Sequence, residues 1–452
     1  MNCGNQDKPL LNNLTNIFKL GIISRVSMTN IYFQTHGCST NFSETEVMQG
    51  LLKEAGFEIV TQPEEADIIV INICTVKGEE TALREIRKLK ENFPGKKIVI
   101  AGCISREIIE PIREITEDAP LISTHNIKSI REVIEELINE NVIEMLAKEN
   151  EVKINLPKVR RNSIIGIVPI LSGCEHECSY CSVRLIKGRL FSYPMDIIVK
   201  DVKNCLKDGC KEIWITSMDN ASYMLDKGGR KLPELLNDLI NINQSFFLRI
   251  GMMNPEELRP ILKKMIEIYK HQKVFKFLHI PVQSGNNRIL KLMNRGYRVE
   301  DFKEIVEAFR KEIPHITIST DIIAGFPTET EEEFKDSLEL VREIKPGVLN
   351  ISRFRERPRT RALYMEQLPS GVGKERTRLL TEIFENISRM NNEKWIGWEG
   401  TALIDEIGKG ETFIGRNICY KPIVIRGNLK LGDFVEVKVT NSAVYNLAAD
   451  LL

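Results

Sequence analysis

Three cysteines near the middle of the chain have a spacing that could bind an iron–sulfur cluster. Cys174, Cys178 and Cys181 follow the pattern C-x3-C-x2-C. A cubane cluster has four irons to ligate, so three thiolates leave one iron open to another ligand. A zinc site is the alternative, but zinc usually takes a fourth cysteine or histidine at a fixed spacing. The further donors in this region fit such a site poorly, and they are His176, Cys205 and Cys210.

The triplet resembles the signature of the radical-SAM superfamily. In that superfamily the open iron chelates the amino and carboxylate groups of S-adenosylmethionine and passes one electron to its sulfonium. The resemblance implies S-adenosylmethionine as a cofactor and the three thiolates as ligands of a [4Fe–4S] cluster.

A second set of three cysteines is spread over the first part of the chain. Cys38, Cys74 and Cys103 each follow an apolar, β-branched run that predicts a strand, and helical segments separate the runs. This alternation is typical of a parallel sheet, in which ligands bind beyond the carboxyl ends of the strands. We therefore expect a second cluster site, although each residue could instead be an ordinary buried cysteine. The predicted strands are residues 30–36, 67–73 and 97–102, and the predicted helices are 43–55 and 78–92.

The middle of the chain repeats a strand followed by a helix six times. Six parallel strands with helices outside make a partial barrel, in which sites collect at the carboxyl ends of the strands. The cysteine triplet comes directly after the first strand and therefore belongs to that end. The predicted strands are residues 164–170, 212–217, 246–251, 275–281, 316–322 and 348–354.

Other residues near these strand ends are candidates for binding S-adenosylmethionine. Each of them could instead cap a helix or stabilise a solvated turn. The candidates are Tyr180, Asp219, Arg249, Gln283, Ser284, Asp321, Gly325 and Phe326.

The last part of the chain consists of short alternating runs separated by glycines. The runs predict a small antiparallel β-barrel, of the size used for oligonucleotide-binding modules. Residues 391–452 contain seven Lys or Arg and eight Asp or Glu, so this module is not a basic surface for phosphates. The predicted strands are residues 399–404, 413–417, 423–426 and 434–439.

Basic residues are concentrated around the predicted mouth of the barrel. The whole chain holds 63 Lys or Arg and 63 Asp or Glu, so only a local patch could attract a polyanion. Residues 158–161, 184–189 and 353–361 are rich in Lys and Arg. Each run alone could be a solvated face, but three runs around one opening favour RNA. The predicted RNA-binding residues are Arg353, Arg355, Arg357, Arg359 and Arg361.

Length and composition set the broad class. A chain of 452 residues can form two or three domains with full cores. It has no long apolar run for a membrane span and no convincing signal peptide, and its cluster thiolates require a reducing compartment, so we expect a cytoplasmic protein. We expect residues 1–27 to be a disordered or untranslated extension. The predicted domains are 28–145, 146–390 and 391–452.

From Met28 onward the chain resembles the radical-SAM methylthiotransferases. Their N-terminal domain has motifs similar to Thr35-His-Gly-Cys38, Asn72-Ile-Cys74 and Ala101-Gly-Cys103, and their C-terminal domain is a TRAM domain. The segments 156–160, 188–194, 212–217, 278–284 and 321–327 are most similar to the archaeal and eukaryotic branch, which acts on threonylcarbamoyladenosine in tRNA. Two places differ from the usual pattern, Met218 and residues 357–361.

The resemblance implies a reaction and its participants. The family converts N6-threonylcarbamoyladenosine at position 37, in the tRNA anticodon loop, to its 2-methylthio derivative. It implies two [4Fe–4S] clusters. The one on Cys174, Cys178 and Cys181 cleaves S-adenosylmethionine to a radical, and the one on Cys38, Cys74 and Cys103 carries the transferred sulfur. A flavodoxin-like or ferredoxin-like electron donor and a sulfur source are further partners.

Three other functions remain compatible with the sequence. The chain could modify isopentenyladenosine in tRNA or an aspartate of a ribosomal protein. It could be a non-catalytic iron–sulfur RNA-binding protein. It could also be a radical-SAM enzyme that uses its second cluster for electron transfer alone.

Overall fold

The computed structural model describes residues 29–452, so the expectation for residues 1–27 lies outside the described part. The described residues form two compact units, the first ending at Arg161 and the second comprising Asn162–Leu452. In the described part, no helix combines the length and the apolar composition that a membrane span requires.

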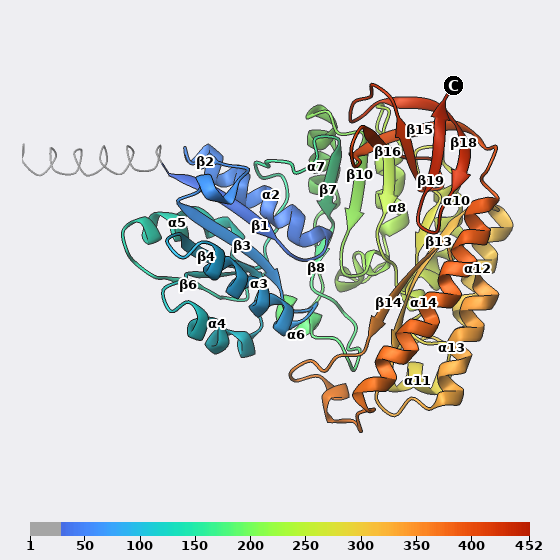
Figure 1. The fold of residues 1–452 in the computed structure, drawn as a ribbon, viewed down its shortest axis with the longest axis horizontal. Coiled ribbons are helices and arrows are strands. Elements are labelled where there is room, and N and C mark those ends of the chain that lie inside the picture. The colour runs from blue at the N-terminus through green and yellow to red at the C-terminus, as the bar shows by residue number, and fades with distance from the viewer. Residues whose placement is uncertain (1–28) are drawn as a thin grey trace, which may run out of the picture. The chain divides into compact units, whose positions relative to one another are not determined.

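The first unit is built on a six-stranded parallel sheet in the order β2-β1-β3-β4-β5-β6 (Figure 1). Its central strand, β3, is buried along its whole length, and successive side chains enter two different cores: Ile68 and Val70 on one face, Ile69 and Ile71 on the other. Helices α2 and α5 cover the first face, and α3 and α4 cover the second. The strands are β1 Asn30–Thr35, β2 Glu58–Ile59, β3 Ile68–Cys74, β4 Lys97–Cys103, β5 Leu121–Ser123 and β6 Glu144–Met145; the helices are α2 Ser39–Glu54, α3 Glu79–Asn92, α4 Ile109–Ile115 and α5 Ile130–Ile138.

The second unit contains six parallel strands that form a partial barrel. They make two sheets, β7-β10-β11 and β12-β13-β14, which a parallel bridge between Leu248 and Val274 connects. The strands are β7 Ile165–Pro169, β10 Glu212–Thr216, β11 Phe247–Ile250, β12 Phe277–His279, β13 Thr317–Ala324 and β14 Val348–Arg353. The predicted fold class is therefore confirmed.

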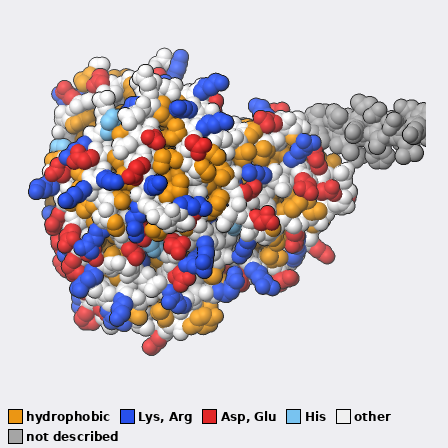
Figure 2. All heavy atoms as spheres, turned by 180° about the vertical axis from the view of Figure 1, so that it is seen from behind, with side chains coloured by type: hydrophobic (Ala, Val, Ile, Leu, Met, Phe, Trp, Pro, Cys, Tyr) orange, Lys and Arg blue, Asp and Glu red, His pale blue; other side chains and the backbone are white. Residues whose placement is uncertain are grey.

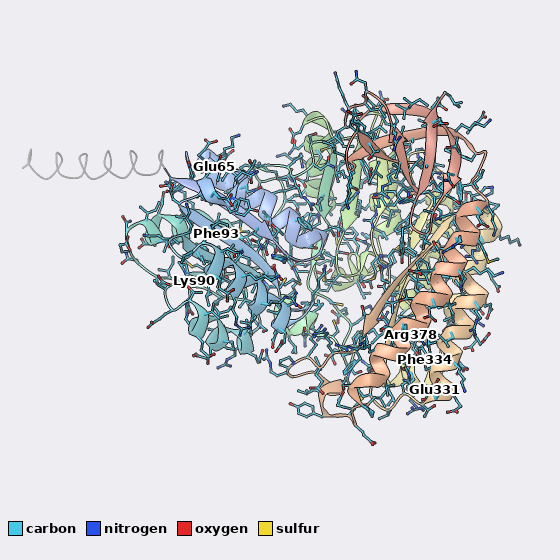
Figure 3. The ribbon with its side chains drawn as sticks, in the orientation of Figure 1. Glu65, Lys90, Phe93, Glu331, Phe334 and Arg378 are labelled. Atoms are coloured by element: carbon cyan, nitrogen blue, oxygen red, sulfur yellow. The ribbon has the colours of Figure 1, made fainter. Side chains whose placement is uncertain are left out.

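Helices cover the outside of these strands. Two of these helices, α13 and α14, pack side by side. Figure 3 shows them with Phe334 labelled on α13 and Arg378 labelled on α14. Between these helices, the buried Arg376 forms an ion pair of 2.6 Å with Glu329 and stacks on the Phe334 ring. The main helices are α7 Met195–Lys207, α8 Leu232–Ile240, α10 Leu262–Lys270, α12 Val299–Glu312, α13 Glu331–Ile344 and α14 Ser370–Glu393.

The C-terminal segment forms a closed five-stranded barrel in the order β15-β16-β17-β19-β18 (Figure 1). It packs on the amino-terminal ends of the parallel strands: the Tyr420 hydroxyl donates to Glu212 at the start of β10, at 2.9 Å, and the rings of Phe434 and Phe247 are 5.8 Å apart. The carboxyl ends are at the opposite end of the same barrel. The strands are β15 Glu399–Ile407, β16 Thr412–Arg416, β17 Pro422–Arg426, β18 Phe434–Ser442 and β19 Leu447–Leu451.

Candidate active site

The triplet Cys174, Cys178 and Cys181 lies in a loop beyond the carboxyl end of β7. Two short antiparallel strands, β8 (Leu171–Ser172) and β9 (Phe191–Ser192), close the base of this loop. At its start Gly173 has a φ of +72°, and a Cβ there would lie 2.0 Å from the Arg189 carbonyl, so this position requires glycine. All three cysteines are partly exposed.

The electrostatics of these thiols fit a metal-binding set. Burial raises the pKa of Cys174 to about 12, and the charge of Asp219 adds to this effect. Burial also raises the pKa of Cys181 to about 11, with a further contribution from Cys178. A bound cation reverses this balance and deprotonates its thiol ligands. Without a bound cation, Cys174 and Cys181 therefore stay protonated near neutral pH and are not reactive free thiolates.

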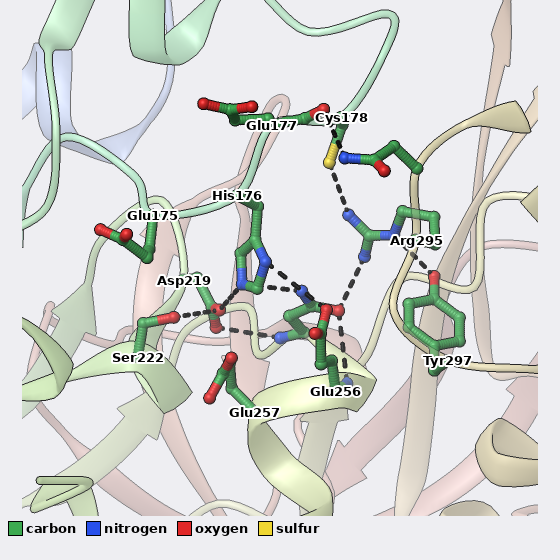
Figure 4. A network of polar contacts seen from close by, with 12 residues as sticks. Glu175, His176, Glu177, Cys178, Asp219, Ser222, Glu256, Glu257, Arg295 and Tyr297 are labelled. Atoms are coloured by element: carbon green, nitrogen blue, oxygen red, sulfur yellow. Dashed lines mark hydrogen bonds and ion pairs between the residues drawn. The ribbon is translucent and has the colours of Figure 1, made fainter. Parts of the chain in front are cut away.

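A guanidinium lies against one of the three sulfurs. Nη1 of Arg295 is 3.1 Å from Sγ of Cys178 (Figure 4). Its other nitrogens donate to Asn254 Oδ1 at 2.9 Å and to the Tyr297 hydroxyl at 3.0 Å. Tyr297 in turn donates to the carbonyl of Val282 at 2.8 Å. Arg295 is therefore held in one orientation, with a positive charge on the cysteine loop.

A second polar contact fixes the same loop (Figure 4). His176 Nε2 lies 3.2 Å from Asp219 Oδ2 and 2.9 Å from the Asn254 amide. Burial opposes the charged form of this imidazole, but the hydrogen bond to Asp219 and the negative charges of Asp219 and Glu256 together outweigh it and raise the pKa of His176. Asp219 also accepts from the Ser222 hydroxyl at 2.5 Å and from the backbone N–H of Ala221 at 3.1 Å. The structure thus ties this carboxylate to protein groups and directs it at the cysteine loop.

Polar side chains form a row across the neighbouring strands β12, β13 and β14. Asp321 Oδ1 accepts from His279 Nε2 at 2.9 Å and from the Asn350 amide at 2.7 Å. Gln283, whose φ is +73°, bridges to β13 through its backbone, and Ser284 is buried beside it. Sequence reasoning missed His279 and Asn350, although His279 lies inside one of the quoted family motifs and Asn350 stands in a predicted strand.

Tyr180, Gly325 and Phe326 meet at the side of the cysteine loop. The Tyr180 and Phe326 rings pack edge to face, with centroids 6.4 Å apart. Gly325 has a φ of +74°, and a Cβ there would be 3.0 Å from Gly373 on α14, so a larger residue would push α14 away. These three candidates therefore lie close to the cysteines.

Arg249 is placed elsewhere. It lies within β11, and its guanidinium stacks on the rings of Trp214, Phe277 and Tyr420 at 4.9, 5.2 and 5.2 Å. Tyr420 belongs to the C-terminal barrel, so Arg249 points toward the amino-terminal end, away from the other candidates. The reason is register, because Arg249 pairs with Trp214 inside the sheet and does not follow the last paired residue.

The second set of cysteines lies at the carboxyl edge of the first unit's sheet. Cys74 and Cys103 are the last residues of the adjacent strands β3 and β4 and are register partners, and Cys38 caps the start of α2 after β1. The side chain of Asn41 contacts two of the sulfurs: Oδ1 accepts from Cys38 Sγ at 3.4 Å, and Nδ2 is 3.8 Å from Cys103 Sγ. Asn41 is buried and is held by Asn72 at 3.1 Å. Asn41 therefore links Cys38 and Cys103, and Cys74 is the register partner of Cys103 on the adjacent strand.

The segment 353–361 packs on the cysteine loop of the second unit. Arg361 donates to the carbonyl of Glu177 at 2.7 Å, and the N–H of Ala362 donates to the carbonyl of Ser179 at 2.8 Å. Arg357 is half-buried, and its charge is among those that counter the burial of Cys181. The other predicted RNA-binding residues are exposed, and they are Arg353, Arg355 and Arg359. On the face shown in Figure 2, basic and acidic side chains alternate, in keeping with the balanced charge of the chain.

Comparisons with known proteins agree with this geometry. Residues 168–341 match the model of the Radical SAM superfamily, residues 30–123 match uncharacterized protein family UPF0004, and residues 394–452 match the TRAM domain. The radical-SAM match indicates S-adenosylmethionine and an iron–sulfur cluster as cofactors. The structure of the radical S-adenosylmethionine methyltransferase TsrM from Kitasatospora setae, with cobalamin and a [4Fe–4S] cluster bound, has the same fold, with a TM-score of 0.51 over 74% of each chain at 13% identity.

Curated relatives align along almost the whole chain. A probable threonylcarbamoyladenosine tRNA methylthiotransferase of Pyrococcus horikoshii is 39% identical over 94% of this chain and 100% of the relative. One of Methanothermobacter thermautotrophicus is 36% identical over 93% and 99%. The threonylcarbamoyladenosine tRNA methylthiotransferase of Homo sapiens is 36% identical over 91% of this chain and 72% of the relative. The family predicted from the sequence is confirmed: the chain belongs to the threonylcarbamoyladenosine tRNA methylthiotransferases, a family of radical-SAM proteins with a TRAM domain.

Proposed function

We propose that this protein converts N6-threonylcarbamoyladenosine at position 37 of tRNA into its 2-methylthio derivative. The observation that carries the proposal is the presence of two three-cysteine sets, each beyond the carboxyl ends of parallel strands, in a chain whose relatives in archaea and eukaryotes carry this name. When bound, S-adenosylmethionine and iron–sulfur clusters supply radical chemistry that can replace an unactivated aromatic C–H bond.

The residues of the second unit divide into holding and orienting groups. Cys174, Cys178 and Cys181 would hold the radical-SAM cluster, and Arg295 and His176 keep their loop in place through the contacts described above. The polar row of His279, Asp321 and Asn350 and the nearby Gln283 and Ser284 offer hydrogen-bonding groups to S-adenosylmethionine at the same end of the barrel.

Cys38, Cys74 and Cys103 would hold the second cluster, the site of the sulfur that is transferred. Asn41 keeps two of these thiols around one centre. A flavodoxin-like or ferredoxin-like protein would supply electrons, and a separate sulfur source would reload the site.

Exposed arginines of segment 353–361 would contact the tRNA backbone near the cysteine loop. An anticodon-loop base is unpaired, so it can enter a site without the melting of a duplex. Arg353, Arg355 and Arg359 extend from a segment that is anchored to the loop through Arg361.

Nucleoside analysis of tRNA tests this function. Cells that lack the gene should accumulate N6-threonylcarbamoyladenosine and lose its 2-methylthio derivative. Wild-type protein and a Cys210→Ala control should restore the derivative, whereas the triple variant Cys174→Ala, Cys178→Ala, Cys181→Ala should not. A normal level of the derivative with the triple variant would refute the proposal. Loss of methylthio-isopentenyladenosine in place of this nucleoside would show another substrate.

A second measurement separates an enzyme from an RNA-binding protein. Reduced protein that is mixed with S-adenosylmethionine should release 5′-deoxyadenosine, and the triple variant should release none. A purely structural cluster would release none in either protein.

A further inference from the structure

A cavity of about 470 Å³ lies where the C-terminal barrel packs on the amino-terminal ends of the parallel strands. It is bordered by the start of β13, the turn before β14 and the end of α14. The cysteine triplet lies beyond the carboxyl ends of the same strands, so this cavity is separate from the candidate active site.

Four cationic side chains line the cavity, and no Asp or Glu lines it. They are Arg310, Lys345, Lys394 and Lys421. In the described part of the chain none of the four forms an ion pair. Their hydrogen bonds go to neutral oxygens: Arg310 donates to the carbonyl of Ile344 at 2.6 Å, and Lys421 donates to the side chain of Asn392 at 2.9 Å.

Two of these cations are costly to keep charged. Burial lowers the pKa of Arg310, and it lowers the pKa of Lys421 to about 8. Buried charges in proteins normally have a partner of opposite sign. Positive charge held around a cavity without a carboxylate therefore fits an anionic ligand.

Aromatic rings form another part of the wall. The rings of Trp395 and Trp398 are 5.6 Å apart and nearly perpendicular, and His315 packs against Trp395 at 6.2 Å. Both tryptophans are only half-buried, although they also contact the core of the C-terminal barrel. Flat rings next to cations are the features with which proteins bind unpaired nucleotides, because every base can stack and every nucleotide carries a phosphate.

A second cavity of about 410 Å³ adjoins the first and shares Trp398 and Ile418 with it. Its wall also combines aromatic rings with a cation, namely Phe247, Phe434 and Lys273, and contains no acidic residue. Trp398 therefore lies between two spaces, each large enough for a base.

We propose that the two cavities bind consecutive unpaired nucleotides of RNA, with bases against Trp395 and Trp398 and a phosphate on Arg310, Lys345, Lys394 and Lys421. The site goes beyond the proposed methylthiotransferase function, since it lies at the other end of the barrel and needs neither iron nor S-adenosylmethionine. A free mononucleotide shares this chemistry and is the other source of such a ligand.

Tryptophan fluorescence can test the site on the full-length protein. The chain has three tryptophans, and the third, Trp214, lines neither cavity. AMP should quench the fluorescence, adenosine without phosphate should bind at least about tenfold more weakly, and an unstructured oligoadenylate should bind more tightly than AMP because it fills both cavities.

Matched charge reversals give the control. Lys345→Glu with Lys394→Glu should weaken AMP and oligoadenylate binding at least about tenfold. The control variant, Lys409→Glu with Lys430→Glu, changes the net charge by the same amount. Both lysines are exposed residues of the C-terminal barrel that line neither cavity, so this variant should bind AMP and oligoadenylate as the wild type does. Thermal melts of both variants confirm that they are folded.

The results decide between the sources and can overturn the site. If tRNA displaces AMP, the natural ligand is RNA; if AMP binds but tRNA does not displace it, the ligand is a free nucleotide and the RNA assignment is wrong. Absence of quenching by AMP and oligoadenylate, or equal binding by the two double variants, would refute the site altogether.

Discussion

The guanidinium of Arg295 lies 3.1 Å from the sulfur of Cys178, although 117 residues separate them in the sequence. Its remaining nitrogens are held by Asn254 and Tyr297, so the group cannot turn away without breaking those bonds. A donor on a ligating sulfur stabilises negative charge on that sulfur and thereby affects the potential of a cluster.

Arg295→Gln should therefore lower the midpoint potential of the radical-SAM cluster, because the reduced cluster loses a cation and a hydrogen bond. S-adenosylmethionine cleavage should fall about 10-fold to 100-fold, as is typical when a group that supports a metal ligand is removed. An EPR-monitored redox titration measures the potential. The exposed Arg298→Gln is the control, and equal potentials in the two variants would refute this role for Arg295.

The iron content of the reconstituted protein should show whether each of the two cysteine sets binds a cluster. Reconstituted protein should bind about eight irons as two four-iron clusters, and loss of either set should leave about four. Cys174, Cys178 and Cys181 are replaced together in one variant, and the other three cysteines in a second. Unchanged iron in the second variant would exclude a cluster in the first unit.

Asn41→Ala should affect only the second set, because this side chain contacts Cys38 and Cys103. We expect reduced iron content and loss of the methylthio product, with 5′-deoxyadenosine formation largely retained. Mössbauer iron counts and product analysis on one sample measure both effects. If the methylthio product forms at the wild-type rate, Asn41 has no part in the second site.

Lys421→Met should stabilise the ligand-free protein near neutral pH. Burial lowers the folded pKa of Lys421 to about 8, from an ordinary value of 10.5, so the charged form costs folding energy below pH 8. The penalty shrinks as pH rises from about 8 to 10.5, because in this range the unfolded state still binds the proton that the folded state has lost, so a higher pH favours folding. The gain at pH 7 should be about 1–3 kcal/mol, reduced by the lost bond to Asn392.

Thermal melts of wild type and Lys421→Met at pH 7 and pH 10 measure this difference. The melting temperatures should differ at pH 7 and approach each other at pH 10. A difference that stays constant with pH would mean that the charge of Lys421 is not the cause.

Neutralising Arg353, Arg355 and Arg359 with glutamine should weaken tRNA binding and reduce its salt dependence by about one counterion for each lost phosphate contact. S-adenosylmethionine cleavage without RNA should be nearly unchanged. Glutamine at Arg298, Arg342 and Arg378, which are at least half exposed and paired with glutamates, is the control. Equal salt slopes in the two triple variants would place the RNA elsewhere.

The sequence alone determined the alternation of strands and helices and the strand ends at which the cysteines lie. Strong β-branched runs predicted β3 and β4 with their terminal Cys74 and Cys103, because a buried parallel strand leaves a clear local pattern. It also predicted the partial barrel. The sequence did not predict β19, since Leu447–Leu451 contains no β-branched or aromatic residue. The predicted start of α2 was four residues too late, because Cys38 is an unusual N-cap.

The tertiary structure alone decided which distant side chains meet. No local sequence pattern predicts that Arg295 contacts Cys178. No local pattern predicts that Arg249 packs against Tyr420, away from the residues at the strand ends. The cavity beside Trp395 likewise exists only because the C-terminal barrel packs on the opposite end of the parallel strands. A local sequence pattern indicates which side chains of one segment are buried and whether they repeat with the period of a helix or a strand. The contacts described here depend instead on strand register and on how separate segments pack around a common core.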